Sequence, residues 1–194
     1  MKVPDANRRI ADLNRTLEGI YDDYRTLLLN VKYNGERLRT ATRKNRILEF
    51  IIAVGASGSG IAGFALWKTD SGQYAWGAIS GAAILVSIIK PILNLGHDIE
   101  ENSQLWAEYA TLFARCRNVI RSIEGARSRI AQTGDLPENV QEEVRSIRAK
   151  MVELAPRGDQ KPSRRRVEAL QAEVNAEIPP ATLWVPFPEE KSDD

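Results

Sequence analysis

Five cations gather in the C-terminal third of the sequence, in a pattern that suits a phosphate ligand. They are Arg157, Lys161, Arg164, Arg165 and Arg166. The planar guanidinium fork of arginine matches phosphate oxygens, and a helix beginning near Ser163 would aim its first backbone N–H groups in the same direction. The expected ligand is a nucleotide messenger or a short nucleic-acid oligomer.

The same segment is also rich in acids, which leaves a second interpretation open. Carboxylates close enough in sequence to pair with these cations are Glu142, Glu143, Glu153, Glu168 and Glu173. The cluster is therefore either a ligand site or a solvated face whose charges neutralise one another.

Catalytic residue patterns are not visible. The chain contains one cysteine, Cys116, and one histidine, His97, and it has no glycine-rich phosphate loop. Nucleophilic and metal-assisted catalysis both need several such groups at defined spacings. We expect no catalytic residues, no metal and no cofactor, and a protein that is not an enzyme.

The elements that would position the cation cluster include two long uncharged runs, Phe50–Trp67 and Gly72–Ile89. Each is close to the roughly 20 residues that a helix needs to cross a bilayer. The mean hydropathy of −0.34 and net charge of +1 for all 194 residues average these runs with highly charged flanks. We expect a two-helix transmembrane hairpin over 47–95. The alternative is a buried hairpin in a soluble protein, which would leave little chain to cover both helices.

Orientation follows from the basic segment ERLRTATRKNR (36–46), which precedes the first run, whereas the turn between the runs offers only Lys68. The positive-inside rule places both termini in the cytoplasm and the hairpin in the cell inner membrane. Alone, this segment would suit anionic lipid or nucleic acid. The predicted register places His97, Asp98, Glu100 and Glu101 opposite it, which favours internal ion pairs.

Small residues recur at every fourth position inside both runs. Gly55, Ser59 and Gly63 form one track, and Gly77 and Gly81 form a second. Such tracks let helix backbones approach closely in lipid. Additional small residues lie on other faces, so we expect several hairpins to pack together as a homo-oligomer. The tracks serve either packing alone or also the wall of a water-accessible pore.

Apolar residues flank the membrane segment with an alternating spacing of three and four, from Ile10 to Val31 and again from Ile99 to Ile130. This is a heptad seam. Laid antiparallel, the two series pair Tyr24 with Cys116 and Leu27 with Phe113, which predicts one continuous helical hairpin from about Pro4 to Gln132.

The predicted fold is therefore all-α: a long antiparallel hairpin, made of a coiled-coil stalk and two transmembrane helices, with a small C-terminal helical region. The segments are 1–46, 47–95, 96–132, 133–178 and a tail, 179–194. In 133–178 the spacing predicts one helix after Pro137 and another after Ser163. The predicted buried residues of the first are Val140, Val144, Ile147, Met151 and Leu154.

The segment from Val31 to Gly125 resembles the SLATT family of two-transmembrane effectors from bacterial anti-phage systems. The resemblance rests on KYNGERLRTATRKNR before the first run and on WAEYATLFARCRNVI after the second, with Trp106, Tyr109 and Leu112 at family-like positions. It implies a membrane-disrupting effector whose nucleotide-type signal comes from a partner nucleotidyltransferase. The signal either opens the assembly or holds it shut, and no ligand residue carries over.

The predicted function is a membrane effector that oligomerises and permeabilises or depolarises the membrane in anti-phage defence. A nucleotide or oligonucleotide bound on the cytoplasmic helices would gate it. The alternative is a membrane-anchored coiled-coil scaffold with no pore activity.

Overall fold

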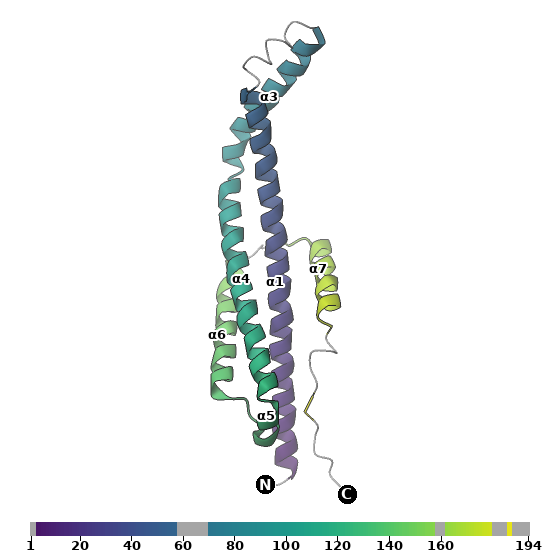
Figure 1. The fold of residues 1–194 in the computed structure, drawn as a ribbon, viewed down its shortest axis with the longest axis vertical. Helices are drawn as coiled ribbons and strands as arrows, with labels where there is room; N and C mark the ends of the chain where they lie inside the picture. The colour runs from purple at the N-terminus through teal and green to yellow at the C-terminus, as the bar shows by residue number, and fades with distance from the viewer. Residues whose placement is uncertain (1–2, 58–69, 158–161, 180–185, 188–194) are drawn as a thin grey trace. The chain divides into compact units, whose positions relative to one another are not determined.

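The computed structural model describes residues 3–57, 70–157, 162–179 and 186–187, and the helices account for nearly all of them. The elements are α1 (Val3–Ser57), α3 (Asp70–Ile92), α4 (Leu95–Gly125), α5 (Arg127–Thr133), α6 (Glu138–Leu154), the 3₁₀ turn η1 (Ala155–Arg157) and α7 (Arg164–Glu177) (Figure 1). No strand occurs in this part of the chain. The all-α prediction is confirmed.

The chain divides into two compact units. Unit 1 contains Met1–Asn34 and Leu105–Asp194, and unit 2 contains Gly35–Gln104. The helices α1 and α4 each contribute one part to either unit.

Unit 1 is built on the antiparallel packing of α1 against α4 (Figure 1). The rings of Tyr24 and Phe113 stack with centroids 4.7 Å apart, and the Cys116 thiol donates to the Ile20 carbonyl at 3.9 Å. Both contacts join residues about one helical turn away from the predicted partners. Side chains of facing helices interdigitate, so a residue touches the diagonal neighbours of its opposite number.

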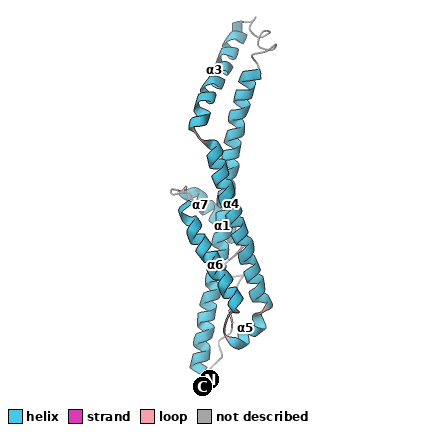
Figure 2. Cartoon of the chain, turned by 90° about the vertical axis from the view of Figure 1, so that its left-hand side faces the viewer, coloured by secondary structure: helices cyan, strands magenta, loops and turns pink. Residues whose placement is uncertain are grey.

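The C-terminal helices cover this pair: α6 lies along α4, and α7 lies along α1 (Figure 1 and Figure 2). On α6 the buried residues are Val140, Val144, Ile147 and Leu154, with Met151 partly buried against the same core, as the spacing predicted. On α7, Val174 is fully buried and packs with Leu28 of α1. Unit 1 thus has two apolar clusters, and the partly buried Tyr24 and Phe113 pack against both of them.

Two local features direct the chain from α5 into α6. Gly134 caps α5 in the left-handed region with φ of 72°, and its N–H donates to the Ile130 carbonyl. Pro137 is the N-cap of α6, one position earlier than the first-turn role expected for it. Its fixed φ suits either place.

Unit 2 contains the last part of α1, all of α3 and the start of α4. The predicted continuous helix is interrupted here, because α3 ends at Ile92 and Asn94 adopts a φ of 44°. Pro91 lacks an N–H, and its ring clashes with the carbonyl four residues earlier. Asparagine tolerates the left-handed conformation better than most residues, so a break after Lys90-Pro91 is physically expected.

Candidate functional site

The predicted cation cluster is divided between two short elements. Arg164, Arg165 and Arg166 form the first turn of α7, and Arg157 ends the η1 turn. Lys161 lies outside the described residues. Ser163 is the N-cap of α7 with extended backbone angles, and its side chain makes no capping hydrogen bond.

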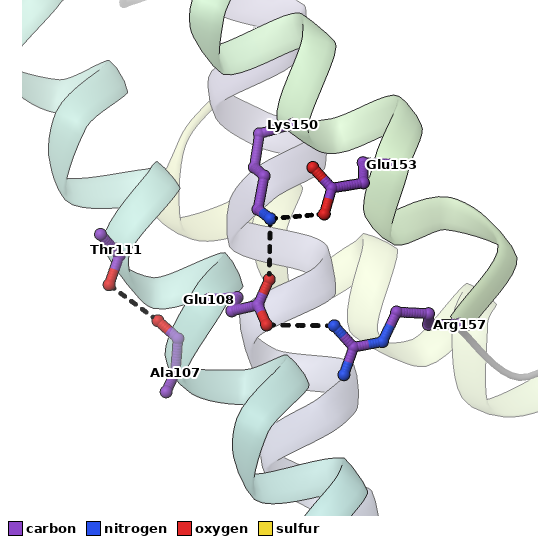
Figure 3. A network of polar contacts seen from close by, with 6 residues as sticks. All are labelled: Ala107, Glu108, Thr111, Lys150, Glu153 and Arg157. Carbon is purple, nitrogen blue, oxygen red and sulfur yellow. Dashed lines mark hydrogen bonds and ion pairs between the residues drawn. The ribbon is translucent and has the colours of Figure 1, made fainter.

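Arg157 is engaged with α4, as Figure 3 shows. Its Nη1 donates to Glu108 Oε1 at 3.1 Å. The other oxygen of Glu108 lies 3.6 Å from Lys150 Nζ, which also donates to Glu153 at 2.7 Å. This carboxylate sits between two cations, so much of the Arg157 charge is neutralised inside unit 1.

Arg164 pairs with Glu168 one turn further along α7, with Nε and Oε1 2.7 Å apart. Both side chains are largely exposed, at 92% and 61%, and exposed pairs of this kind contribute little to stability. Arg165 is exposed and Arg166 half-buried. The first turn of α7 therefore remains the most cationic part of the predicted site.

The other basic residues near the cluster tie helices of unit 1 together. Arg115 donates from two nitrogens to the carboxylate of Glu143, at 2.7 and 3.1 Å. The hydrogen bond from this guanidinium lowers the pKa of Glu143. Arg148 of α6 donates to Asp23 of α1 at 2.6 Å. For the cations that precede Arg157 in the sequence, these pairs support the interpretation that their charges are neutralised by nearby carboxylates.

A pocket that the sequence analysis missed lies within unit 1, close to the start of α7. Its volume is about 350 Å³. We call it the Asn34 pocket, and its lining is Thr26, Leu29, Asn30, Tyr33, Asn34, Tyr109, Met151, Ala155, Pro162 and Val167. Among the described residues, no charged side chain is part of this lining. A polar residue in an apolar seam was the available signal, because Asn34 continues the heptad phase of α1.

Asn34 is 3% exposed. Its Nδ2 donates to the Asn30 carbonyl at 2.9 Å, while its Oδ1 is buried without a hydrogen-bond partner. Across the pocket, burial raises the pKa of the Tyr109 phenol, and the Glu108 charge adds to the effect. Tyr109 is therefore uncharged at neutral pH.

The described part of the chain offers few groups that could act as a nucleophile or bind a metal. Burial is the main cause that raises the pKa of Cys116 to about 12, so its thiol stays protonated at neutral pH and is a poor nucleophile. No group of three or more metal-ligating His, Cys, Asp or Glu side chains occurs among the residues that the structure describes.

The glycine tracks differ in what they face. A Cβ atom added to Gly55 would lie 2.1 Å from Ala83 Cβ, so α1 and α3 approach closely at this point of unit 2. A Cβ atom added to Gly77 or Gly81 would meet no atom of the described residues within 4 Å. Ser59 and Gly63 lie outside the described residues.

Unit 2 exposes much of its apolar surface. Residues of α3 that are at least half exposed are Tyr74, Ile84, Leu85, Ile88 and Ile92. Phe50 of α1 is 70% exposed. Many large apolar side chains exposed in one unit suggest an interaction site or a membrane contact.

Within the described residues, no single helix has the length and apolarity for a membrane span. Two consecutive helical segments, Gly77–Ile92 and Leu95–Gly125, together have the length and composition of a membrane span. They are bent by 49° at the break between them. Most of the first predicted run, from residue 58 onward, lies outside the described residues.

The basic segment 36–46 does not form the expected ion pairs. Among the described residues, no ion pair joins it to His97, Asp98, Glu100 or Glu101. Exposed Arg39, Arg43 and Arg46 instead line a groove that continues into Ile47 and Phe50. Their spacing of four and three residues places them on one face of α1.

One ion pair links α1 and α3 within unit 2: Lys90 Nζ lies 3.1 Å from Glu49 Oε1. Asn45 donates to the same oxygen at 2.9 Å.

Comparisons of the chain with protein-family models, with curated proteins and with solved structures find no match.

Proposed function

We propose that this chain is a membrane effector that oligomerises and permeabilises or depolarises the cell inner membrane in anti-phage defence. A nucleotide or oligonucleotide bound on unit 1 would gate it. The observation that carries the proposal is the exposed apolar surface of unit 2.

Lipid contact explains that surface better than water does. Large side chains such as Leu85, Ile88 and Ile92 would each expose apolar area to solvent at a cost of about 25 cal/mol per Å². In a bilayer the same side chains meet hydrocarbon and incur no such cost. A transmembrane hairpin over 47–95, with a coiled-coil stalk formed by the flanking heptads, agrees with this distribution.

The arginines ahead of the hairpin support the orientation. Arg39, Arg43 and Arg46 are exposed and lie next to Phe50, where the uncharged run begins. Cations at this position are retained on the cytoplasmic side. Both termini would then be cytoplasmic, and unit 1 would meet signals made in the cell.

The glycines of α3 support self-association. Among the described residues, none lies within 4 Å of a Cβ atom added to Gly77 or Gly81, whereas one added to Gly55 would meet Ala83. In lipid, a small-residue face allows a second helix to approach closely. We assign Gly77 and Gly81 to contacts between subunits and Gly55 to the contact within a subunit. Ser59 and Gly63 stay predictions.

The resemblance to SLATT effectors supports the biological setting. The resemblance implies a nucleotide-type signal that a partner nucleotidyltransferase makes. It does not determine whether the signal opens the assembly or holds it shut. Arg165 and Arg166 at the start of α7 are the most suitable phosphate contacts, with Arg157, Lys161 and Arg164 as the remaining predicted members.

A membrane-anchored scaffold without pore activity is the alternative, and one observation favours it. Arg157 and Arg164 are held in ion pairs with Glu108 and Glu168, which lowers the free charge available for a ligand. A scaffold would share the lipid-facing surface but would not conduct.

Dye leakage from liposomes tests the proposal. The purified full chain is reconstituted into vesicles loaded with a self-quenching dye, and a small nucleotide panel is added. We expect leakage that depends on a nucleotide, either switched on or switched off by it. Leakage that never occurs under any condition would favour the scaffold.

Paired glycine variants make this test specific. Gly77→Leu with Gly81→Leu should abolish leakage and shift the protein to a smaller species on size exclusion in detergent. Gly125→Leu is the matched control, because Gly125 is also an open helical glycine but lies in unit 1. Loss of activity in the control as well would remove the assignment of Gly77 and Gly81.

A further inference from the structure

Asn34, one of the residues that line the pocket, carries a buried side-chain oxygen without a hydrogen-bond partner. The orientation of the Asn34 amide is fixed, because the Asn30 carbonyl can only accept and so must face the amide nitrogen. The oxygen is then left buried and without a partner. Buried polar groups are rarely left unpaired, so this oxygen marks a place where a hydrogen-bond donor is missing.

The lining defines what kind of donor fits. The lining includes Tyr33, Tyr109 and Met151, and none of the described lining residues is charged. A charged group would lose its hydration here without a compensating partner. The part of a ligand that enters the pocket must therefore be neutral, largely apolar on its faces and equipped with an N–H donor. A nucleobase has these properties, and about 350 Å³ lies within the usual range of small-molecule pockets.

The segment between two of the lining residues carries positive charge. Pro162 and Val167 belong to the lining, and Arg164, Arg165 and Arg166 lie between them in sequence, on the first turn of α7. That turn presents guanidinium groups together with backbone N–H groups that the Ser163 side chain does not cap. Helix N-termini of this kind favour phosphate.

We propose that the Asn34 pocket binds the base of a nucleotide through an N–H···O bond to Asn34 Oδ1, with the phosphate held at Arg165 and Arg166. This inference rests on the nucleotide control proposed above and names the residue that recognises the base. It also explains how a site can select a nucleotide over inorganic phosphate, which arginines alone cannot do.

Calorimetry on the full chain in detergent tests the inference. The probes are AMP, GMP, CMP, UMP, the dinucleotide pApA and inorganic phosphate. At least one nucleotide should bind more tightly than phosphate, and Asn34→Leu should weaken that binding by about tenfold or more. Asn102→Leu is the matched control, because Asn102 is also a buried asparagine that donates to a carbonyl four residues earlier, but in unit 2. It should change the affinity by less than about twofold.

Two further variants keep the test decisive. If Asn34→Leu does not fold, Val167→Trp fills the pocket from its half-buried wall and should have the same effect on binding. Arg165→Gln should weaken nucleotide binding, reduce its dependence on salt and leave binding of the matching nucleoside unchanged.

The outcomes separate this inference from the membrane proposal. Failure of every nucleotide to bind, or wild-type affinity in both Asn34→Leu and Val167→Trp, would overturn the pocket assignment. In the second case a nucleotide can still gate leakage, so the proposed function would survive. Binding that depends on Asn34 without any leakage would retain the pocket and remove the pore.

Discussion

The two units of this chain differ in whether their large apolar side chains are buried or exposed. In unit 1 the large residues of α1, α4 and α6 are buried, with Leu17, Leu27 and Leu154 at 0% exposure. Among the described residues, the exposed large apolar side chains all lie in unit 2 except Trp106 and Val152. A domain that buries its apolar side chains is stable in water. Helices that expose apolar side chains are typical of proteins in contact with lipid.

Charged groups show the same contrast. Unit 1 uses ion pairs such as Arg115–Glu143 and Arg148–Asp23 to join its helices. In unit 2 the pair that joins α1 to α3 is Lys90–Glu49, and the arginines of segment 36–46 stay exposed. Charged side chains thus join helices throughout unit 1, whereas several arginines of unit 2 are exposed.

The largest expected effect comes from the same truncation made once in each unit. Leu27→Ala should destabilise unit 1 by about 2–5 kcal/mol, because it leaves a cavity in a packed core. Leu85→Ala, at a residue 60% exposed, should cost less than about 1 kcal/mol. Chemical denaturation in detergent, followed by circular dichroism, measures both. Equal losses would contradict the contrast between the units.

An intermediate effect is expected where α1 and α3 meet. Gly55→Ala places a methyl group against Ala83, so it should cost about 1–3 kcal/mol through overpacking. Gly81→Ala would meet no atom of the described residues within 4 Å, so it should be neutral or stabilise α3 by up to about 1 kcal/mol. Thermal melts of the two variants, with Gly55→Ala/Ala83→Gly as a rescue, give the comparison. A harmless Gly55→Ala would show that the close approach is not maintained.

The smallest expected effect concerns pH and the Arg115–Glu143 pair. Because the pKa of Glu143 is lowered in the folded state, the pair stabilises the protein above the unfolded pKa of about 4.3. That contribution is lost as the pH falls through the lowered folded value. Both side chains are more than a third exposed, so Glu143→Gln should cost at most about 1 kcal/mol at pH 7.

Melting temperatures of wild type and Glu143→Gln between pH 7 and pH 3 check this sign. The two curves should converge toward acid. A difference that stays constant, or grows as the pH falls, would show that the pair does not act through charge.

Helix positions and the buried face of α6 could be predicted from the sequence because periodicity reports directly on one-sided burial. The spacing of Val140, Val144, Ile147 and Leu154 needs no knowledge of the partner helix. The break at Asn94 was harder to place, since Pro91 permits a kink or a helix end and only local backbone geometry decides between them.

The candidate site was less predictable because it depends on contacts between distant segments. Arg157 and Glu108 are far apart in sequence, so their ion pair could not be inferred from local charge patterns. The Asn34 pocket combines residues of α1, α4, α6, η1 and α7, and its one sequence signal was an asparagine in an apolar seam. Ion pairs between segment 36–46 and residues 97–101 were expected from the antiparallel register, but none joins these segments among the described residues.

The proposal that unit 2 contacts lipid and unit 1 contacts water is tested by the accessibility of two exposed apolar positions in the reconstituted protein. Spin labels are attached at Leu85→Cys in unit 2 and at Val152→Cys in unit 1, each in a Cys116→Ala background. Val152 is 73% exposed and Leu85 is 60% exposed, so exposure alone does not separate them. We predict that the label at position 85 collides mainly with oxygen dissolved in lipid and the label at 152 mainly with a water-soluble nickel complex. Equal access of the nickel complex to both positions would contradict it.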